Sequence, residues 1–245
     1  MGNTLRLNRI DVIRQIIDRK NAKTYLEIGV RSGDAFLKIK AKNKYGVDPN
    51  FTISHWKKFR YYFKNPYNIF NEYFGVTSDA FFDKENSRLS KSGIDVVFID
   101  GLHTFAQSLK DVHNSLQYLN SNGVIVLHDC NPSSAAAALP AKSFEEIAKI
   151  NPAGFAGVWN GDVWKTIVCL RATRKDLKVF VLDCDFGLGI ITKEPPESTL
   201  KYSAEEVQNF SYDDLSENRK TMLNLKEAIY LQEFLSGQTA QTQKN

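Results

Sequence analysis

The 245-residue sequence predicts an α/β fold built around a mostly parallel β-sheet. Short apolar runs alternate with longer segments whose apolar residues recur at helical spacing, which is the pattern of repeated strand–helix–strand units. Several apolar runs end in an acidic residue, and a turn with two glycines follows the first run. Because ligands of an open parallel sheet bind beyond the carboxyl ends of its strands, the acids and glycines predict a binding site there.

The composition is that of an ordinary globular protein, with 42% hydrophobic and 24% charged residues. The net charge of +4 is small and acids are interspersed with basic residues, so no nucleic-acid partner is expected. No apolar run approaches the length of a membrane span, and no signal-peptide segment is recognisable. The three cysteines lack C-x-x-C spacing. We therefore expect a cytoplasmic protein with buried, unpaired thiols.

The first part of the chain alternates predicted helices and strands. Residues 7–20 place their apolar side chains on one helical stripe. Residues 24–30 predict a strand covered on both faces, and residues 44–48 predict the next strand. The aromatic-rich residues 51–74 predict a helix and a loop. Residues 73–82 predict the end of a third strand followed by a helix.

Residues 94–101 and 123–129 are the clearest predicted strands. The helix between them is expected to end at the Asn122-Gly123 pair, since glycine favours helix termination. Two later apolar runs, residues 166–173 and 178–193, predict an antiparallel hairpin at one edge of the sheet. Together these segments predict seven strands.

The chain divides into a domain of residues 1–200 and a helical extension of residues 201–245. Within the domain, residues 143–150 predict a further helix. The extension is polar with helical spacing near its end, and the alternatives for it are a lid, a dimerisation arm or a packed helix. Its last residues, 237–245, are expected to be disordered.

The first predicted turn favours a ligand without phosphates. Glycines at positions 29 and 33 let the backbone approach a ligand and open a helix N-terminus toward it. Arg31 stands where a dinucleotide site has the glycine that makes room for a pyrophosphate, so a nucleoside is favoured. Asp48, at the end of the next strand, is placed to accept hydrogen bonds from ribose hydroxyls. The alternative is two turn glycines and a helix-capping aspartate.

Asp100 and Asp129 are expected side by side at the ends of adjacent strands. Two such carboxylates repel each other unless a cation or a proton lies between them, and their oxygens suit Mg²⁺ or Ca²⁺. His103, three residues after Asp100, would overhang the same point and take a proton from a substrate hydroxyl. The alternative is that both aspartates cap turns while His103 bonds to a backbone carbonyl. His128 is expected to be a packed strand residue.

These motifs together resemble the class I S-adenosylmethionine-dependent methyltransferases, and within them the bacterial sugar O-methyltransferases of antibiotic and surface-glycan pathways. The resemblance covers residues 22–195 and rests on "LEIGVRSGDAF", "GVDP", "VTSDAFF" and "VFIDGLHTF…GVIVLHDCNP", which occur in the family's order. It implies a Rossmann-like, doubly wound fold and S-adenosylmethionine as cofactor. The implied reaction is methyl transfer to a hydroxyl of a sugar or glycan precursor.

The resemblance also implies roles for single residues. The cofactor would contact Glu27, Gly29 and Gly33 at its methionine end, Asp48 at its ribose, Thr77, Ser78 and Asp79 around its adenine, and also Asp100. His103 and Asp100 would be the catalytic residues, with His103 as general base. The aromatic residues between His55 and Tyr73, together with the C-terminal tail, would shape the acceptor pocket.

The sequence also resembles catechol O-methyltransferase, which implies that Asp100 and Asp129 could hold Mg²⁺. That enzyme has an asparagine ligand directly after its second acid, where this sequence has Cys130. Because a thiol is a poor Mg²⁺ ligand, either Asn131 or a water substitutes or the metal is absent.

Two other functions stay open. A nicotinamide-dependent oxidoreductase or epimerase would need a glycine in place of Arg31 and, in its common form, a Tyr-x-x-x-Lys pair. The stretch Tyr61-Tyr62-Phe63-Lys64 has both residue types without that spacing. A non-catalytic module would keep the fold and bind a partner through the tail. A homo-oligomer is a further open alternative.

Overall fold

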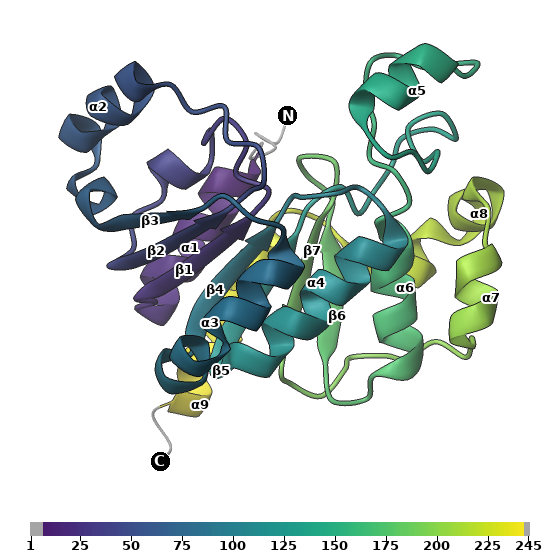
Figure 1. Ribbon diagram of the computed structural model, residues 1–245. Helices are drawn as coiled ribbons and strands as arrows, with labels where there is room; N and C mark the ends of the chain where they lie inside the picture. The colour runs from purple at the N-terminus through teal and green to yellow at the C-terminus, as the bar shows by residue number, and fades with distance from the viewer. Residues whose placement is uncertain (1–6, 243–245) are drawn as a thin grey trace, which may run out of the picture.

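An eight-stranded sheet forms the centre of the computed structural model, which describes residues 7–242 (Figure 1). Its strands lie in the order β3-β2-β1-β4-β5-β7-β6-β8. Their bounds are Thr24–Ile28 (β1), Asn43–Val47 (β2), Asn71–Phe74 (β3), Ile94–Ile99 (β4), Leu119–Leu127 (β5), Lys178–Leu182 (β6), Leu188–Thr192 (β7) and Leu225–Lys226 (β8). Strand β7 is antiparallel to both β5 and β6, and the other neighbours are parallel. The chain order reverses between β1 and β4, where such folds bind ligands.

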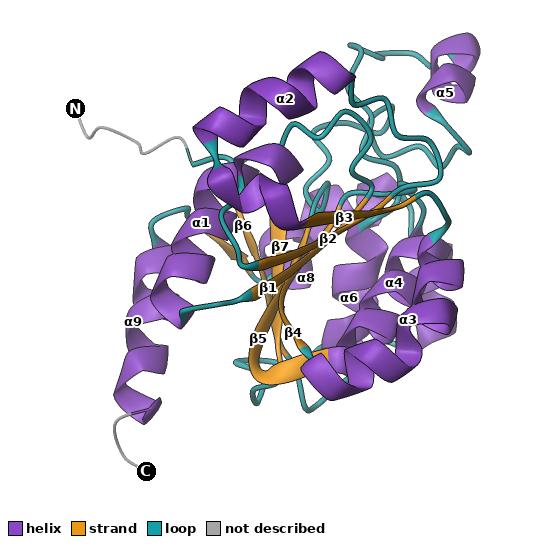
Figure 2. Cartoon of the chain, turned by 60° about the vertical axis from the view of Figure 1, so that its left-hand side comes forward, coloured by secondary structure: helices purple, strands orange, loops and turns teal. Residues whose placement is uncertain are grey.

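Helices cover both faces of this sheet (Figure 2). The helices of the described chain are α1 (Arg9–Lys20), α2 (His55–Lys64), α3 (Ser78–Ser92), α4 (Phe105–Tyr118), α5 (Phe144–Ile150), α6 (Trp164–Thr173), α7 (Ala204–Asn209), α8 (Tyr212–Leu223) and α9 (Tyr230–Thr242), with short 3-10 helices η1 (Phe36–Lys38) and η2 (Pro66–Phe70). Helices α3, α4, α6 and α8 bury apolar residues against one face, and α1 and α9 against the other.

Neighbouring residues of the central strands point to opposite cores. On β4, Val97 and Ile99 join one core, whereas Val96 and Phe98 join the other. Because both faces are covered, such strands are apolar throughout, as the sequence indicated. The predicted α/β fold, with a mostly parallel sheet and an antiparallel C-terminal hairpin, is confirmed.

Helix α1 carries its first residue to the carboxyl edge of the sheet. The Asn8 side chain caps the helix by accepting bonds from the backbone N–H groups of Ile10 and Asp11, and the Asp11 carboxylate accepts a bond from the Asn8 N–H. The predicted apolar stripe is buried and includes Val12 and Ile16. Arg9 therefore begins the helix in a fixed position next to the strand ends.

Two predictions about secondary structure are wrong. Residues predicted as the first strand of the hairpin, 166–173, belong to helix α6, and both hairpin strands come from residues 178–193. Helix α6 is buried without a break from Trp164 to Arg171, so it lacks the polar face that reveals helical spacing. The Asn122-Gly123 pair does not end helix α4 but lies within β5.

The C-terminal extension packs against the sheet domain. Leu215 and Leu223 join one core, and Leu231 and Phe234 of α9 join the other. The short β8 also adds an eighth strand beside β6 that the sequence did not predict. The predicted disorder began at residue 237, but α9 continues to Thr242, and residues 243–245 lie outside the described part. Across residues 7–242, no helix combines the length and apolar character needed to cross a bilayer.

Candidate active site

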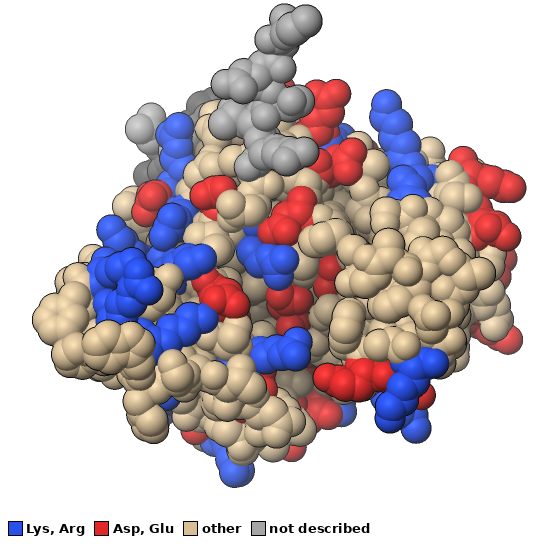
Figure 3. All heavy atoms as spheres, turned by 90° about the horizontal axis from the view of Figure 1, so that it is seen from above, with Lys and Arg blue, Asp and Glu red and all other residues tan. Residues whose placement is uncertain are grey.

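A cavity of about 1180 Å³ lies at the carboxyl ends of the central strands. Its wall includes these predicted site residues: Glu27, Gly29, Asp48, Thr77, Ser78, Asp79, Asp100, His103 and Asp129. Seen from above, acidic and basic side chains lie close together around the centre of this face (Figure 3). Gly33 lies outside this wall, and its N–H closes the first turn by donating to the Val30 carbonyl at 2.7 Å.

The first turn brings two strand ends into direct contact. Gly29 has a φ of 89°, and a Cβ atom there would lie 2.0 Å from the backbone oxygen of Asp100, so only glycine fits. Asp48 fixes the same turn, because its two carboxylate oxygens accept bonds from the backbone N–H groups of Arg31 and Asn50, each at 2.7 Å. A carboxylate can accept about four hydrogen bonds, so Asp48 keeps capacity for ligand hydroxyls.

Glu27 is a buried carboxyl at the floor of the cavity. The Tyr25 hydroxyl donates a hydrogen bond to it. Burial raises the pKa of Glu27 to about 8, against the bond from Tyr25 and the charge of Lys44. Burial also lowers the pKa of Lys44 to about 7, although its ammonium donates to the backbone oxygen of Phe36. Without a ligand, Glu27 is therefore largely protonated at neutral pH, and a ligand cation would favour its ionised form.

A polar group at the start of helix α3 lines another part of the wall. The Ser78 hydroxyl donates to Asp111 Oδ1 at 2.6 Å, and Gln107 Nε2 donates to the same oxygen at 2.9 Å. Burial raises the pKa of Asp111 to about 6. Thr77 and Asp79 flank Ser78. The sequence did not point to Gln107 or Asp111, because both lie within the regular pattern of helix α4.

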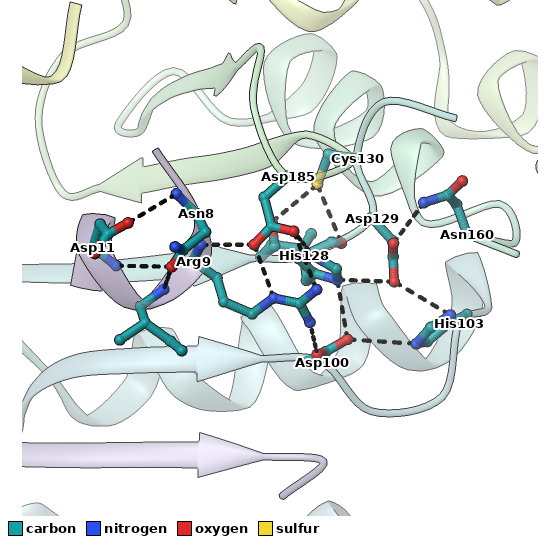
Figure 4. Close-up of polar contacts among 12 residues, drawn as sticks. Asn8, Arg9, Asp11, Asp100, His103, His128, Asp129, Cys130, Asn160 and Asp185 are labelled. Atoms are coloured by element: carbon teal, nitrogen blue, oxygen red, sulfur yellow. Dashed lines mark hydrogen bonds and ion pairs between the residues drawn. The ribbon is translucent and has the colours of Figure 1, made fainter. Parts of the chain in front are cut away.

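Two imidazoles and two carboxylates meet at the ends of β4 and β5 (Figure 4). The ring nitrogens of His103 lie 3.5 Å from Asp100 Oδ1 and 3.3 Å from Asp129 Oδ2. Nδ1 of His128 lies 3.2 Å and 3.0 Å from the same two oxygens. His128 is thus more than the packed strand residue that we expected, since its ring bridges both carboxylates.

Three further contacts hold this cluster in place. The indole of Trp159 stacks on the His103 ring with centroids 4.9 Å apart, and its backbone oxygen lies 3.3 Å from His103 Nδ1. Asn160 Nδ2 donates to Asp129 Oδ1 at 2.5 Å. Asp129 adopts a left-handed backbone with a φ of 61°, which is uncommon outside glycine and is typical of constrained functional positions.

Arg9 enters the cluster from the N-terminal helix (Figure 4). One of its terminal nitrogens donates to Asp100 Oδ2 at 2.8 Å, and its Nε donates to Asp185 Oδ2 at 2.9 Å. Asp185 belongs to the β6–β7 turn, where its φ is 45°. Neither residue was predicted, because no local motif marks them and only the fold brings them to β4.

The charges of this cluster balance one another. Burial lowers the pKa of both histidines, but the carboxylates of Asp100 and Asp129 overcome this, so the pKa of His103 is raised and that of His128 is well above its usual value. Against the effect of burial, the charge of His128 holds the pKa of Asp100 well below its usual range. Hydrogen bonds from His128 and Arg9 likewise lower the pKa of Asp185, against the effect of burial. The Arg9 guanidinium and the two imidazoles therefore lie against the carboxylates of Asp100, Asp129 and Asp185.

Asp100, His103 and Asp129 also offer donor atoms that suit a divalent cation. One ligand atom from each residue lies within 4.8 Å of the others. Two carboxylate oxygens and an imidazole nitrogen are an acceptable donor set for several divalent metals. These three side chains therefore fit a metal, although Arg9 already contacts Asp100 and His128 already contacts Asp129.

The residues after Asp129 do not extend that donor set. Cys130 is fully buried, and its thiol donates to the backbone oxygen of Leu127 at 3.3 Å. Asn131 was predicted as a substitute ligand, but its amide bonds to Asp183 at 3.0 Å and to Arg219, outside the cavity wall. That prediction is wrong, because the left-handed turn at Asp129 directs the following residues away from the cluster.

The expected acceptor pocket is also different. No residue from 53–76 or from the described part of the tail, 201–242, lines the cavity. Its outer wall comes instead from the segments around Phe144 and Trp159 and from Phe186 in the β6–β7 turn.

Comparison with known proteins agrees with this site. Residues 26–130 match the family model described as "Methyltransferase domain". The match runs from β1 to the end of β5 and so includes Glu27, Asp48, Asp100, His103 and Asp129. No curated protein sequence matches the chain significantly.

Solved methyltransferase structures share the fold. The SAH-bound methyltransferase PaMTH1 from Podospora anserina is 20% identical, with a TM-score of 0.51, over 75% of this chain and 76% of that one. The SAM-bound O-methyltransferase TomG from Streptomyces achromogenes, involved in tomaymycin synthesis, is 12% identical, with a TM-score of 0.53, over 76% and 79%. At identities this low, the two matches establish similarity of fold alone.

Proposed function

We propose that the protein is an S-adenosylmethionine-dependent O-methyltransferase acting on a hydroxyl of a small-molecule or glycan acceptor. The observation that carries this proposal is the position of His103 between two carboxylates, at the end of a cavity whose other wall suits a nucleoside. The methyltransferase-domain match supports it. Further support comes from the SAM and SAH bound to the similar structures.

The chemistry of the cavity wall supports the position that we propose for the cofactor. The tight turn at Gly29 admits a ligand close to the backbone. Arg31 stands where a dinucleotide site has the glycine that makes room for a pyrophosphate, which favours a ligand without one. Glu27 would face the ammonium of the methionine part, and Asp48 the ribose hydroxyls. Thr77, Ser78 and Asp79 would surround the adenine. Asp100 lines the same cavity and contacts His103, so it would lie close to the reactive sulfonium.

His103 is the general base in this proposal. As the acceptor oxygen attacks the methyl carbon, the new C–O bond forms, the C–S bond breaks and the hydroxyl proton passes to His103. The neighbouring carboxylates of Asp100 and Asp129 stabilise the resulting imidazolium, and stacking on Trp159 fixes the ring. Because the same carboxylates raise the pKa of His103, the ring must lose its proton before each turnover.

A divalent cation is the alternative arrangement at the same residues. Asp100, Asp129 and His103 would hold it, and it would make the acceptor hydroxyl more acidic. His103 would then be a ligand instead of the base.

The acceptor class rests on motif resemblance. We assign a sugar or glycan precursor, because the motifs resemble sugar O-methyltransferases and the outer wall combines aromatic with polar residues. A cytoplasmic location belongs to the same proposal.

A methyl-transfer assay tests the function. The purified protein is incubated with S-adenosylmethionine and pools of nucleotide sugars, free glycans and catechols, and SAH and methylated products are measured by mass spectrometry. We expect SAH to form only with a hydroxylated acceptor, and the His103→Gln variant to lose this activity. Binding of NAD with no binding of S-adenosylmethionine would contradict the proposal.

A further inference from the structure

Helix α2 turns an aromatic stripe toward solvent. Trp56, Phe59 and Phe63 are 72%, 51% and 77% exposed, and none of the residues of α2 is buried. The three rings contact one another, with centroids 5.8 Å apart for Trp56 and Phe59 and 5.1 Å apart for Phe59 and Phe63. A connected group of exposed aromatic rings marks an interaction site, because soluble proteins seldom leave such a group uncovered.

The adjoining η2 adds to this stripe and is firmly anchored. Its Ile69 and Phe70 are 65% and 67% exposed. Beneath them, the buried Asn68 donates to the backbone oxygens of Leu37 and Tyr61. The exposed side chains therefore stand on a fixed base. We call Trp56, Phe59, Phe63, Ile69 and Phe70 the α2–η2 surface.

Two of the lysines of α2, Lys57 and Lys58, face the protein, whereas an ordinary surface helix turns its charged side chains toward solvent. Lys57 donates to the Ser32 backbone oxygen at 2.8 Å and pairs with Asp34, and the Lys58 ammonium lies 4.1 Å from the centre of the Tyr73 ring. Normal packing of this helix would bury the rings and expose the lysines. The outward direction of the rings is thus held by specific polar contacts.

All charged residues of the segment that carries this surface are basic. Residues 51–71 include Lys57, Lys58, Arg60 and Lys64 and contain no aspartate or glutamate. Arg60 and Lys64 are exposed beside the rings, and Lys40 is exposed close to the end of the helix. In the view from above, basic side chains gather next to uncharged residues on the side where α2 lies (Figure 3). The partner of this surface must therefore be both apolar and negatively charged.

We propose that the α2–η2 surface docks the protein on a membrane surface with anionic lipid headgroups. Aromatic rings enter the headgroup region, where basic side chains are attracted to anionic lipids. A second copy of the chain fits less well, because a two-fold contact would place these basic groups against each other. The acceptor fits less well too, because the surface is outside the cavity wall.

The position of the surface agrees with docking. Helix α2 lies beyond the carboxyl edge of the sheet in both ribbon views (Figures 1 and 2). Asn50 and Thr52 line the cavity, and the chain then continues directly into α2. A docked protein would have its cavity near the headgroups. The docking itself does not depend on the proposed methyl transfer.

Vesicle sedimentation tests this proposal. The full chain is mixed with vesicles of phosphatidylcholine alone, or of phosphatidylcholine with phosphatidylserine, at low salt and at about 0.5 M NaCl. We expect sedimentation with the anionic vesicles only, and its loss at high salt, because ions screen the attraction. Trp56 is far more exposed than the buried Trp164, so its fluorescence should shift to shorter wavelength on docking, and Trp56→Phe should remove the shift.

Paired variants separate docking from self-association. Phe59→Ser with Phe63→Ser, and Arg60→Gln with Lys64→Gln, should each weaken vesicle binding about tenfold or more. The control is Ile229→Ser, which removes an apolar side chain with the same 51% exposure as Phe59. All these side chains are exposed, so circular dichroism melts should stay unchanged. Failure of the unaltered protein to bind anionic vesicles would overturn the proposal. So would a dimer, seen by analytical ultracentrifugation, that the phenylalanine pair dissolves while vesicle binding stays the same.

Discussion

Arg9 donates to the carboxylate of Asp100 at 2.8 Å although 91 residues separate the two in the chain. The same guanidinium reaches Asp185 in the β6–β7 turn, so it ties the first helix to two separate loops of the cavity. With the two histidines, Arg9 balances three carboxylates that would otherwise repel one another. The N-terminal helix is thus part of the candidate active site.

Replacing Arg9 by Met should lower both stability and turnover. We expect the free energy of unfolding to fall by about 1–3 kcal/mol, since two partly buried carboxylates each lose a charged hydrogen bond. Urea titration and the methyl-transfer assay measure the two effects. Arg9→Lys should recover only part of the loss, because a single ammonium cannot bridge both carboxylates. Arg14→Met, an exposed change on the same helix, is the control. Unchanged stability of Arg9→Met would contradict the structural role.

His103→Gln should lower kcat by about 10²–10⁴ and leave S-adenosylmethionine affinity unchanged, because the proposed base acts in the chemical step. Calorimetry gives the affinity and single-turnover kinetics gives the rate. His113→Gln is the matched control, since His113 is an exposed residue of helix α4 outside the cavity. Full activity of His103→Gln would show that a group other than His103 accepts the hydroxyl proton.

Cofactor affinity should depend on pH through Glu27. In the free protein the pKa of Glu27 is about 8, so much of the carboxyl is protonated below that pH. A ligand ammonium favours the ionised form, so binding should tighten as the pH rises from about 6.5 to 8.5. Calorimetry at several pH values measures this, and Glu27→Gln should flatten the curve. An affinity that falls over this pH range would contradict the proposed contact between Glu27 and the methionine end of the cofactor.

The same carboxyl also predicts how stability depends on pH. Its pKa in the folded protein, about 8, lies above the ordinary value of 4.5. Its contribution to stability is therefore complete below pH 4.5 and is lost as the pH rises toward 8, because the unfolded chain ionises first. Urea titrations of the ligand-free protein at several pH values should show a shallower decline for Glu27→Gln. An identical decline in both proteins would contradict the raised pKa.

Chelation should leave the activity in place. The three carboxylates of the cluster already lie against the Arg9 guanidinium and two imidazoles, so we expect them to need no metal charge. We expect the protein to keep its turnover after dialysis against EDTA. Loss of activity that Mg²⁺ or Mn²⁺ restores would instead assign a cation to Asp100, Asp129 and His103.

Local sequence patterns predicted the parts of the site that lie within one strand and its following turn. Asp48, Asp100 and Asp129 could be found because acids at the ends of apolar strands meet at one edge of a parallel sheet. Arg9 and Asp185 could not, because their position depends on how distant segments pack. Helix α6 was mistaken for a strand for a related reason, since complete burial removes the spacing that distinguishes the two.

A binding measurement is the most direct test of whether S-adenosylmethionine is the cofactor. Isothermal titration should compare the unaltered protein with Asp48→Asn, with NAD titrated in parallel. We expect micromolar binding of S-adenosylmethionine, weaker binding by Asp48→Asn with an unchanged melting curve, and no binding of NAD. Absence of S-adenosylmethionine binding, or a preference for NAD, would contradict it.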